Sequence, residues 1–304
     1  MSLNILHLSD LHLSNNTDAD DLVALICNVS MEAPTNLSTN LSPNVIVVTG
    51  DIFDANDFSS DNYRSTIDKA VVFFSSLTSS FGISDFGEQL FFVPGNHEIY
   101  RQSIIDNKSG EELDRYREFL AAIYAEKWTS LVGDIYDEKH LCFVKHFEGE
   151  KTILVGLRSP RYEKPKRKDT SDNLFETSEI RNDQILTMHR KIKKINDYDN
   201  NKVIACLHNN IYNTVERNSE KNVDVTALKD NEKLLAALDA YNCCLILHGH
   251  KHQQSSKKIN LSPNTGDNGH LCTIIGGGTF KESATDSFNY FEIDDKTLVL
   301  KQAS

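Results

Sequence analysis

A short apolar run that ends in a glycine and alternating histidines most constrains what this chain can fold into. Residues 243–247 are apolar and of strand character, and they lead directly into His248-Gly249-His250-Lys251-His252. A glycine here permits a backbone conformation or a close approach that a side chain would block. Two alternating histidines at the end of a buried strand can offer nitrogen ligands to a metal ion. Alone, the pattern is more typical of ordinary loop histidines.

The same arrangement, an apolar strand followed by a polar cluster, occurs at four other places. The strands are expected at 3–8, 45–49, 89–93 and 203–207. The polar residues that follow them are Asp10 and His12, Asp51 and Asp54, Asn96 and His97 with Glu98, and His208. In open α/β sheets, ligands bind beyond the carboxyl ends of the strands, where loops converge. The five clusters together therefore predict one site.

Each cluster also has a structural explanation when it is taken singly. Asp10 could cap a helix, Asp51 and Asp54 could be turn residues, and His208 could be a satisfied core histidine. The coincidence of five clusters at the same kind of position favours the functional interpretation.

Expected strands and helices alternate in the first half of the sequence. Hairpins follow in the middle, and the alternation then resumes before the final strands. The expected helices lie at 18–30, 62–79, 111–127, 177–195 and 227–241, and the remaining strands at 141–147, 151–157, 271–276, 288–294 and 297–301. Two sheets packed face to face with helices outside fit this order. A polar, basic loop at 158–175 is a possible boundary, but the apolar strands on both sides favour one domain over residues 1–304. That domain could be an effector part of a larger protein.

The composition of the 304 residues is that of a soluble globular protein, with 39% hydrophobic and 25% charged residues. The formal charge of −12 argues against a surface coated uniformly for nucleic acid. No apolar run is long enough for a membrane span, and we expect no membrane partner. The six cysteines form no C-x-x-C pair. They indicate free core thiols, and the cytoplasm as the expected location.

The polar clusters also carry a family resemblance. Asp10-x-His12, Gly50-Asp51-x-x-Asp54, Gly95-Asn96-His97-Glu98, His208 and Gly249-His250-x-His252 together resemble the motif set of the calcineurin-like metallophosphoesterases. Order and approximate spacing agree from residue 10 to residue 252. The resemblance implies an α/β fold, the four-layer αββα sandwich of two mixed sheets.

The resemblance also implies two divalent or trivalent metal ions, which could be Mn, Fe or Zn. One would be held by Asp10, His12 and His252, the other by Asn96, His208 and His250, and Asp51 would bridge both. A hydroxide that bridges the metals would attack phosphorus. His97 would be the general acid for the leaving group, and Asp54 would accept a hydrogen bond from it.

Two departures from the family pattern affect the substrate. Asn209 stands where many relatives have a second histidine, so it could donate to phosphate but could not carry a proton. Ala55-Asn56 replaces the Arg/His-Gly that often follows the second motif. Arg101 could also reach a substrate phosphate, or it could be a solvated arginine, and Arg158, which ends a strand, is a similar case.

We expect a metal-dependent phosphodiesterase that acts on a nucleotide-type phosphoester. A nuclease of the recombination-repair type, acting on DNA or RNA, is an alternative, although only about 50 residues follow His252. A phosphoprotein phosphatase is another, but such enzymes carry arginine where this chain has Pro94. A non-catalytic scaffold of the same fold would show eroded ligands, and this chain shows none. Metal content would separate a scaffold from the enzymes.

Overall fold

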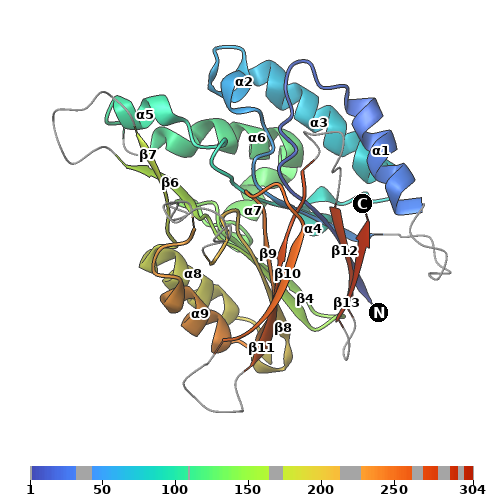
Figure 1. Cartoon of the computed structure of the whole chain (residues 1–304), viewed down its shortest axis with the longest axis vertical. Helices are drawn as coiled ribbons and strands as arrows, with labels where there is room; N and C mark the ends of the chain where they lie inside the picture. The colour runs from blue at the N-terminus through green and yellow to red at the C-terminus, as the bar shows by residue number, and fades with distance from the viewer. Residues whose placement is uncertain are drawn as a thin grey trace, which may run out of the picture.

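The computed structural model describes residues 2–31, 43–108, 110–163, 174–212, 227–261, 270–279, 288–293 and 298–303. Within these residues two mixed β-sheets lie in the middle of the molecule, and helices cover the outer side of each (Figure 1). The four-layer α/β sandwich expected from the sequence is therefore confirmed.

The first sheet has the strand order β13-β12-β1-β2-β3. Its strands are β1 (Leu3–Leu8), β2 (Val45–Thr49), β3 (Leu90–Val93), β12 (Phe288–Ile293) and β13 (Leu298–Ala303). β1, β2 and β3 are parallel, and β12 and β13 extend the sheet antiparallel. Parallel strands are covered on both faces, which explains why all five residues of β2 are buried.

The second sheet has the strand order β10-β11-β9-β8-β5-β4. Its strands are β4 (Phe143–Phe147), β5 (Thr152–Gly156), β8 (Lys202–Cys206), β9 (Cys243–His248), β10 (Ser255–Asn260) and β11 (Leu271–Gly276). The four central strands are parallel, and β4 and β10 pair antiparallel at the edges. The sequence did not predict β10, because this largely exposed edge strand carries no apolar alternation.

Helices lie on both outer faces. In chain order they are α1 (Ala19–Met31), α2 (Ala55–Ser59), α3 (Tyr63–Ser80), α4 (Phe86–Gln89), α5 (Arg101–Ile105), α6 (Asp114–Tyr124), α7 (Trp128–Asp134), α8 (Asn182–Ile192) and α9 (Asn231–Asp239), with short 3₁₀ turns η1 (Glu111–Leu113), η2 (Ala125–Lys127) and η3 (Tyr198–Asn200). Figure 1 shows α1, α3 and α6 on one side and α8 and α9 on the other. None of the described helices is long and apolar enough to cross a membrane.

Successive side chains along the strands of the second sheet point to opposite faces, and this divides the hydrophobic core into two parts. Leu154 and Ile204 pack between the sheets with the residues of β1, β2 and β3. Their neighbours Val155 and Ala205 point the other way and pack with residues of α8 and α9. All six cysteines are free thiols, and four of them are buried, as the sequence predicted for most of them.

One predicted helix and one predicted loop need correction. The helix expected at 177–195 begins only at Asn182, because Phe175–Ser178 forms strand β7. β7 pairs antiparallel with β6 (Pro160–Glu163), so part of the expected loop 158–175 is a small two-stranded sheet. The basic residues Lys164, Lys166, Arg167 and Lys168 lie outside the described residues.

Candidate metal centre

The loops that follow β1, β2, β3, β8 and β9 bring the polar clusters of the sequence together. Three overlapping groups of side chains have possible ligand atoms within 4.8 Å of one another: Asp10, His12 and His252; His12, Asp51 and His97; Asp51, His208 and His250. The expectation that the strand ends converge on one site is thus met.

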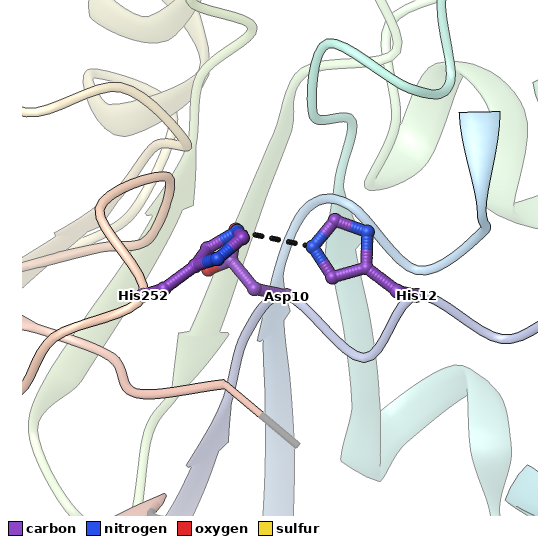
Figure 2. A group of neighbouring side chains, drawn as sticks. All are labelled: Asp10, His12 and His252. Carbon is purple, nitrogen blue, oxygen red and sulfur yellow. Dashed lines mark hydrogen bonds and ion pairs between the residues drawn. The ribbon is translucent and has the colours of Figure 1, made fainter. Parts of the chain in front are cut away.

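The first group joins the loop after β1 to the loop after β9. His252 Nε2 lies 3.4 Å from Asp10 Oδ1 and 3.1 Å from His12 Nε2, and the His252 ring faces His12 in Figure 2. The buried Asp10 carboxylate is fixed from two sides. It accepts a hydrogen bond from Ser9 Oγ at 2.5 Å, and the backbone N–H of His250 donates to both its oxygens at 3.0 and 3.1 Å.

The third group lies around His208, which is fully buried. His208 Nδ1 donates to the Thr49 carbonyl at 2.8 Å, so Nε2 faces the other polar groups. Nε2 lies 2.9 Å from Asn96 Oδ1 and 3.4 Å from Asp51 Oδ2. His250 Nδ1 lies 3.1 Å from the same Asn96 oxygen. Two imidazoles, an amide oxygen and a carboxylate therefore converge here.

Backbone strain is concentrated in these loops. Five of the candidate ligands have a backbone in the left-handed region: Asp10 (φ 53°), His12 (φ 47°), Asp51 (φ 49°), His250 (φ 73°) and His252 (φ 54°). Such a conformation costs on the order of 1–3 kcal/mol per non-glycine residue and persists only where the surroundings impose it. The chain turns sharply at each strand end, and the turn aims the side chain at the site.

Two glycines allow the close approach that the loops need. A Cβ atom at Gly249 would lie 1.9 Å from Ser9 Oγ and 2.6 Å from Asp10 Oδ2, as the first motif suggested. A Cβ atom at Gly95 would lie 2.2 Å from both the backbone nitrogen and Oδ1 of Asp51. Any side chain at either position would displace a candidate ligand.

Glu98 organises the site, a role that the sequence did not reveal. Its side chain is fully buried and accepts hydrogen bonds from the backbone N–H groups of Asp51, Ile52, Phe53 and Gly95 at 2.6–3.2 Å. Burial and the charge of Asp51 raise the pKa of Glu98 to about 8, while the N–H donors lower it. One carboxylate thus holds the loop after β2 against the loop after β3.

The site contains two neutral imidazoles, those of His12 and His250, and one charged pair, His208 with Asp51. Burial lowers the pKa of His12 and of His250 to about 4, so both are neutral at pH 7 and carry a free lone pair. Burial also lowers the pKa of His208, but the charge of Asp51 outweighs it and raises the pKa to about 10. Burial raises the pKa of Asp51, and His208 pulls it well below its usual range. A bound cation would replace the proton in this pair.

These donors fit metal ions. Carboxylate and amide oxygens with neutral imidazoles are a ligand set for first-row transition metals. The Nε2 atoms of His12 and His252 face each other at 3.1 Å, where a shared cation would satisfy both lone pairs. His12 Nδ1 is buried and has no hydrogen-bond partner within the described part of the chain. The two outer groups are therefore able to bind metal, with Asp51 at their junction.

His97 lies in the site, and a backbone carbonyl orients its ring. His97 Nδ1 donates to the Phe53 carbonyl at 2.9 Å, and Nε2 lies 3.8 Å from Asp51 Oδ2. Asp54 caps α2 by accepting from the Asn56 N–H at 2.9 Å. The Phe53 carbonyl thus orients the His97 ring, and the hydrogen bond to Asp54 stays a prediction.

The two predicted substrate contacts differ in their surroundings. Asn209 is fully buried, and its Oδ1 accepts from Ser159 Oγ at 2.8 Å, so a contact with phosphate would require this side chain to move. Arg101 opens α5, and its guanidinium lies 4.4 Å from the centre of the Tyr162 ring. Both substrate contacts stay predictions.

The hairpin of β6 and β7 adds two residues that the sequence did not single out. Tyr162 OH lies 3.4 Å from Glu176 Oε2, and Glu176 Oε1 lies 3.9 Å from His250 Nε2. Burial raises the pKa of the Tyr162 hydroxyl, and a hydrogen bond with Asn96 lowers it. The pair thus forms one wall of the site. Their hairpin follows no strand-end motif, so no signal in the sequence pointed to them.

The fold and this convergence of ligands define a metallophosphoesterase. The sequence model of the calcineurin-like phosphoesterase family matches residues 3–254, and the chain belongs to this family. Members depend on a dinuclear metal centre. No curated protein sequence matches the chain.

Solved structures share the fold at low sequence identity. A dimetal phosphatase from Danio rerio is 12% identical with a TM-score of 0.58, and the match covers 99% of this chain and 96% of that one. Purple acid phosphatase PPD1 from yellow lupin (Lupinus luteus) seeds is 13% identical with a TM-score of 0.58, covering 99% of this chain and 51% of that one. At these identities the likeness shows the fold alone.

Proposed function

We propose that this chain is a dinuclear-metal phosphodiesterase that acts on a nucleotide-type substrate. The observation that carries the proposal is the position of Asp51 between two groups of donors. The first ion would be held by Asp10, His12 and His252, the second by Asn96, His208 and His250, and Asp51 would contact both.

Two bound ions, which we propose to be Mn, Fe or Zn, would polarise the phosphoryl group and make water a nucleophile near neutral pH. His97 would hold the proton that the leaving oxygen takes up. Its Nδ1 atom donates to Phe53, and Nε2 points toward Asp51, on the side where the phosphoryl group would lie. Because a ring nitrogen of His97 also lies within 4.8 Å of ligand atoms of His12 and Asp51, metal content must distinguish an acid from a ligand.

Two features of the site favour a diester over a monoester. Glu176 borders the site beside His250, and burial raises the pKa of its carboxyl group. In its ionised form it would repel a monoester, with a charge near −2 at neutral pH, more strongly than a singly charged diester. Pro94 stands where the protein phosphatases of the family carry an arginine for phosphate. We propose the cytoplasm as its location, which the six free thiols support.

The test compares bis(p-nitrophenyl) phosphate with p-nitrophenyl phosphate at saturating Mn²⁺, since the two share a leaving group. A higher kcat/KM for the diester is expected, and a panel of cyclic nucleotides, dinucleotides, single-stranded DNA and phosphopeptides then locates the natural class. A clear preference for the monoester or for phosphopeptides would refute the diesterase assignment. Absence of bound metal would indicate a scaffold.

A further inference from the structure

A cavity of about 310 Å³ lies next to the candidate metal centre, between α5, η1 and β6. Figure 1 shows α5 close to the β6–β7 hairpin. The lining consists of Ile104, Asn107, Lys108, Glu112, Arg158, Arg161 and Tyr162. Its size is at the lower end of the range for small-molecule sites, which is enough for a phosphate group with part of a sugar or ring.

Arg158 is a buried cation without adequate pairing. The residue is 7% exposed, and its Nε atom is buried without a hydrogen-bond partner among the described residues. Its terminal nitrogens lie 3.4 and 3.5 Å from a single oxygen of Glu112, at the long limit of a hydrogen bond. A buried guanidinium is costly unless strong partners satisfy it. An oxyanion in the cavity would give the terminal nitrogens of Arg158 a stronger acceptor than the distant Glu112 oxygen.

The charges around the cavity favour an anion, although the whole chain carries −12. Three cations line it, Lys108, Arg158 and Arg161, against one carboxylate, Glu112. Two of the cations also face carboxylates outside the lining: Arg161 pairs with Glu179 at 2.8 Å and Lys108 with Asp106 at 3.9 Å. The lining itself has an excess of positive charge.

Two residues connect the cavity to the metal centre. Tyr162 lines the cavity, and its hydroxyl interacts with the candidate ligand Asn96. Ser159 directly follows Arg158, and its Oγ accepts from the backbone N–H of His208 at 3.2 Å. A substrate bound at the metals could therefore extend past Tyr162 to Arg158.

We propose that this cavity binds a second phosphate of the substrate, with Arg158 as its principal ligand and Lys108 and Arg161 in support. This inference rests on the proposed function and narrows it to phosphodiesters that carry a further phosphate group. Ile104 and the Tyr162 ring would pack against the sugar or base between the two phosphates. The substrate class is then a phosphorylated nucleotide ester or a short oligonucleotide end.

A matched pair of esters tests the proposal: the p-nitrophenyl ester of thymidine 5′-phosphate, with and without a 3′-phosphate. Both release the same leaving group, so their KM ratio reports the second phosphate alone. The wild-type protein is expected to show a KM lower by roughly 10- to 100-fold for the 3′-phosphorylated ester, the size of a charged hydrogen-bond set. Arg158→Met should remove this preference, and Arg158→Lys should restore part of it.

Glu112→Gln is the variant that separates binding from folding. It removes the carboxylate that competes for Arg158 and should increase the preference for the 3′-phosphorylated ester. Lys108→Ala, at an exposed position, should reduce the preference by a few fold. Arg190→Met, which removes an exposed arginine of α8, is the control that should leave the ratio unchanged.

Calorimetry with thymidine 3′,5′-bisphosphate and thymidine 5′-monophosphate in Mn²⁺ gives an independent readout. Equal KM values for the two esters, or an intact ratio in a folded Arg158→Met protein, would overturn the assignment while the phosphodiesterase function stands. If Arg158→Met does not fold, an unchanged ratio in Glu112→Gln overturns it. Tighter binding of the bisphosphate without cleavage of either ester would instead support the cavity and refute the proposed function.

Discussion

The strand-end loops and the β6–β7 hairpin border the same site but are built differently. In the loops, short buried side chains are aimed by left-handed backbone, as at Asp51, and by glycine contacts, as at Gly249. The hairpin reaches the site with the long, partly buried side chains of Tyr162 and Glu176. The loops thus fix the positions of the candidate metal ligands, and we expect the hairpin to determine which substrates fit beside them.

The energetics of the two regions follow from this difference. A left-handed residue in a loop costs on the order of 1–3 kcal/mol, so a small backbone change there has large consequences. A ring contact such as that between Arg101 and Tyr162 contributes about 0.5–1 kcal/mol, and its loss should be mild. Substitutions in the strand-end loops should therefore slow the hydrolysis of every substrate, and substitutions in the hairpin should slow the hydrolysis of only some.

The largest effect is expected for Asp51→Asn. Because Asp51 lies between both donor groups, the amide would weaken both proposed metal sites at once. Activity on every phosphoester should fall by a factor of about 10⁴ or more, the combined effect of two impaired metal sites. The assay is hydrolysis of bis(p-nitrophenyl) phosphate in excess Mn²⁺, with elemental analysis of the purified variant. Near wild-type turnover would remove Asp51 from the site.

His97→Asn should show a narrower defect. Both metals should remain bound, and cleavage of esters with poor leaving groups should slow by a factor of about 10² to 10⁴, as for a lost general acid. Nitrophenyl esters should be less affected, because their leaving group needs little protonation. The comparison of the two ester classes is the measurement. Loss of one metal from the variant would show that His97 is a ligand instead.

Gly249→Ala tests the loops without changing a polar group. The added Cβ would lie 1.9 Å from Ser9 Oγ, so the loop must shift and Asp10 with it. We expect a loss of about 1–3 kcal/mol in the free energy of unfolding, as for overpacking, together with weaker Mn²⁺ binding. Gly149→Ala is the matched control, because a Cβ at that exposed turn meets nothing within 4 Å. Equal denaturation midpoints and Mn²⁺ affinities for the two variants would contradict the proposed strain.

The sequence predicted the sheets and the convergence of the candidate ligands because both leave local signals. The buried strands are continuous apolar runs, as in β2, and the ligands stand within a few residues of each strand end, as Asp10 and His12 do. Five repetitions of one pattern, together with the family resemblance, made the convergence of these residues predictable. The left-handed backbone was not predictable, since it occurs where loops distant in the sequence contact one another, as Asp51 contacts Glu98 and His250 contacts Asp10.

The sequence did not predict that the β6–β7 hairpin borders the site, because no local sequence pattern marks its residues. Tyr162 and Glu176 are 14 residues apart, and neither stands beside a strand-end motif. The polar composition of residues 158–175 is typical of a loop, which hides strand β6. Arg158 and Glu112 are 46 residues apart and meet only because α5, η1 and β6 pack together. The end of a strand drew attention to Arg158, but a pairing that depends on long-range packing leaves no pattern in a single sequence.

The smallest effect is expected for Arg101→Gln, which tests the hairpin side of the comparison. Its guanidinium lies over Tyr162, and the substitution removes both this contact and a positive charge near the proposed path of the substrate. KM for a nucleotide diester should rise about 2- to 5-fold, equivalent to the loss of one cation–π contact, with kcat little changed. Arg64→Gln is the matched control, because Arg64 likewise lies over a tyrosine ring, that of Tyr63, but pairs with Glu118. A drop in kcat as large as that of His97→Asn would place Arg101 among the catalytic groups. The strand-end loops and the region beside the β6–β7 hairpin would then not differ in their effect on catalysis. An unchanged KM for every ester would remove Arg101 from the substrate path.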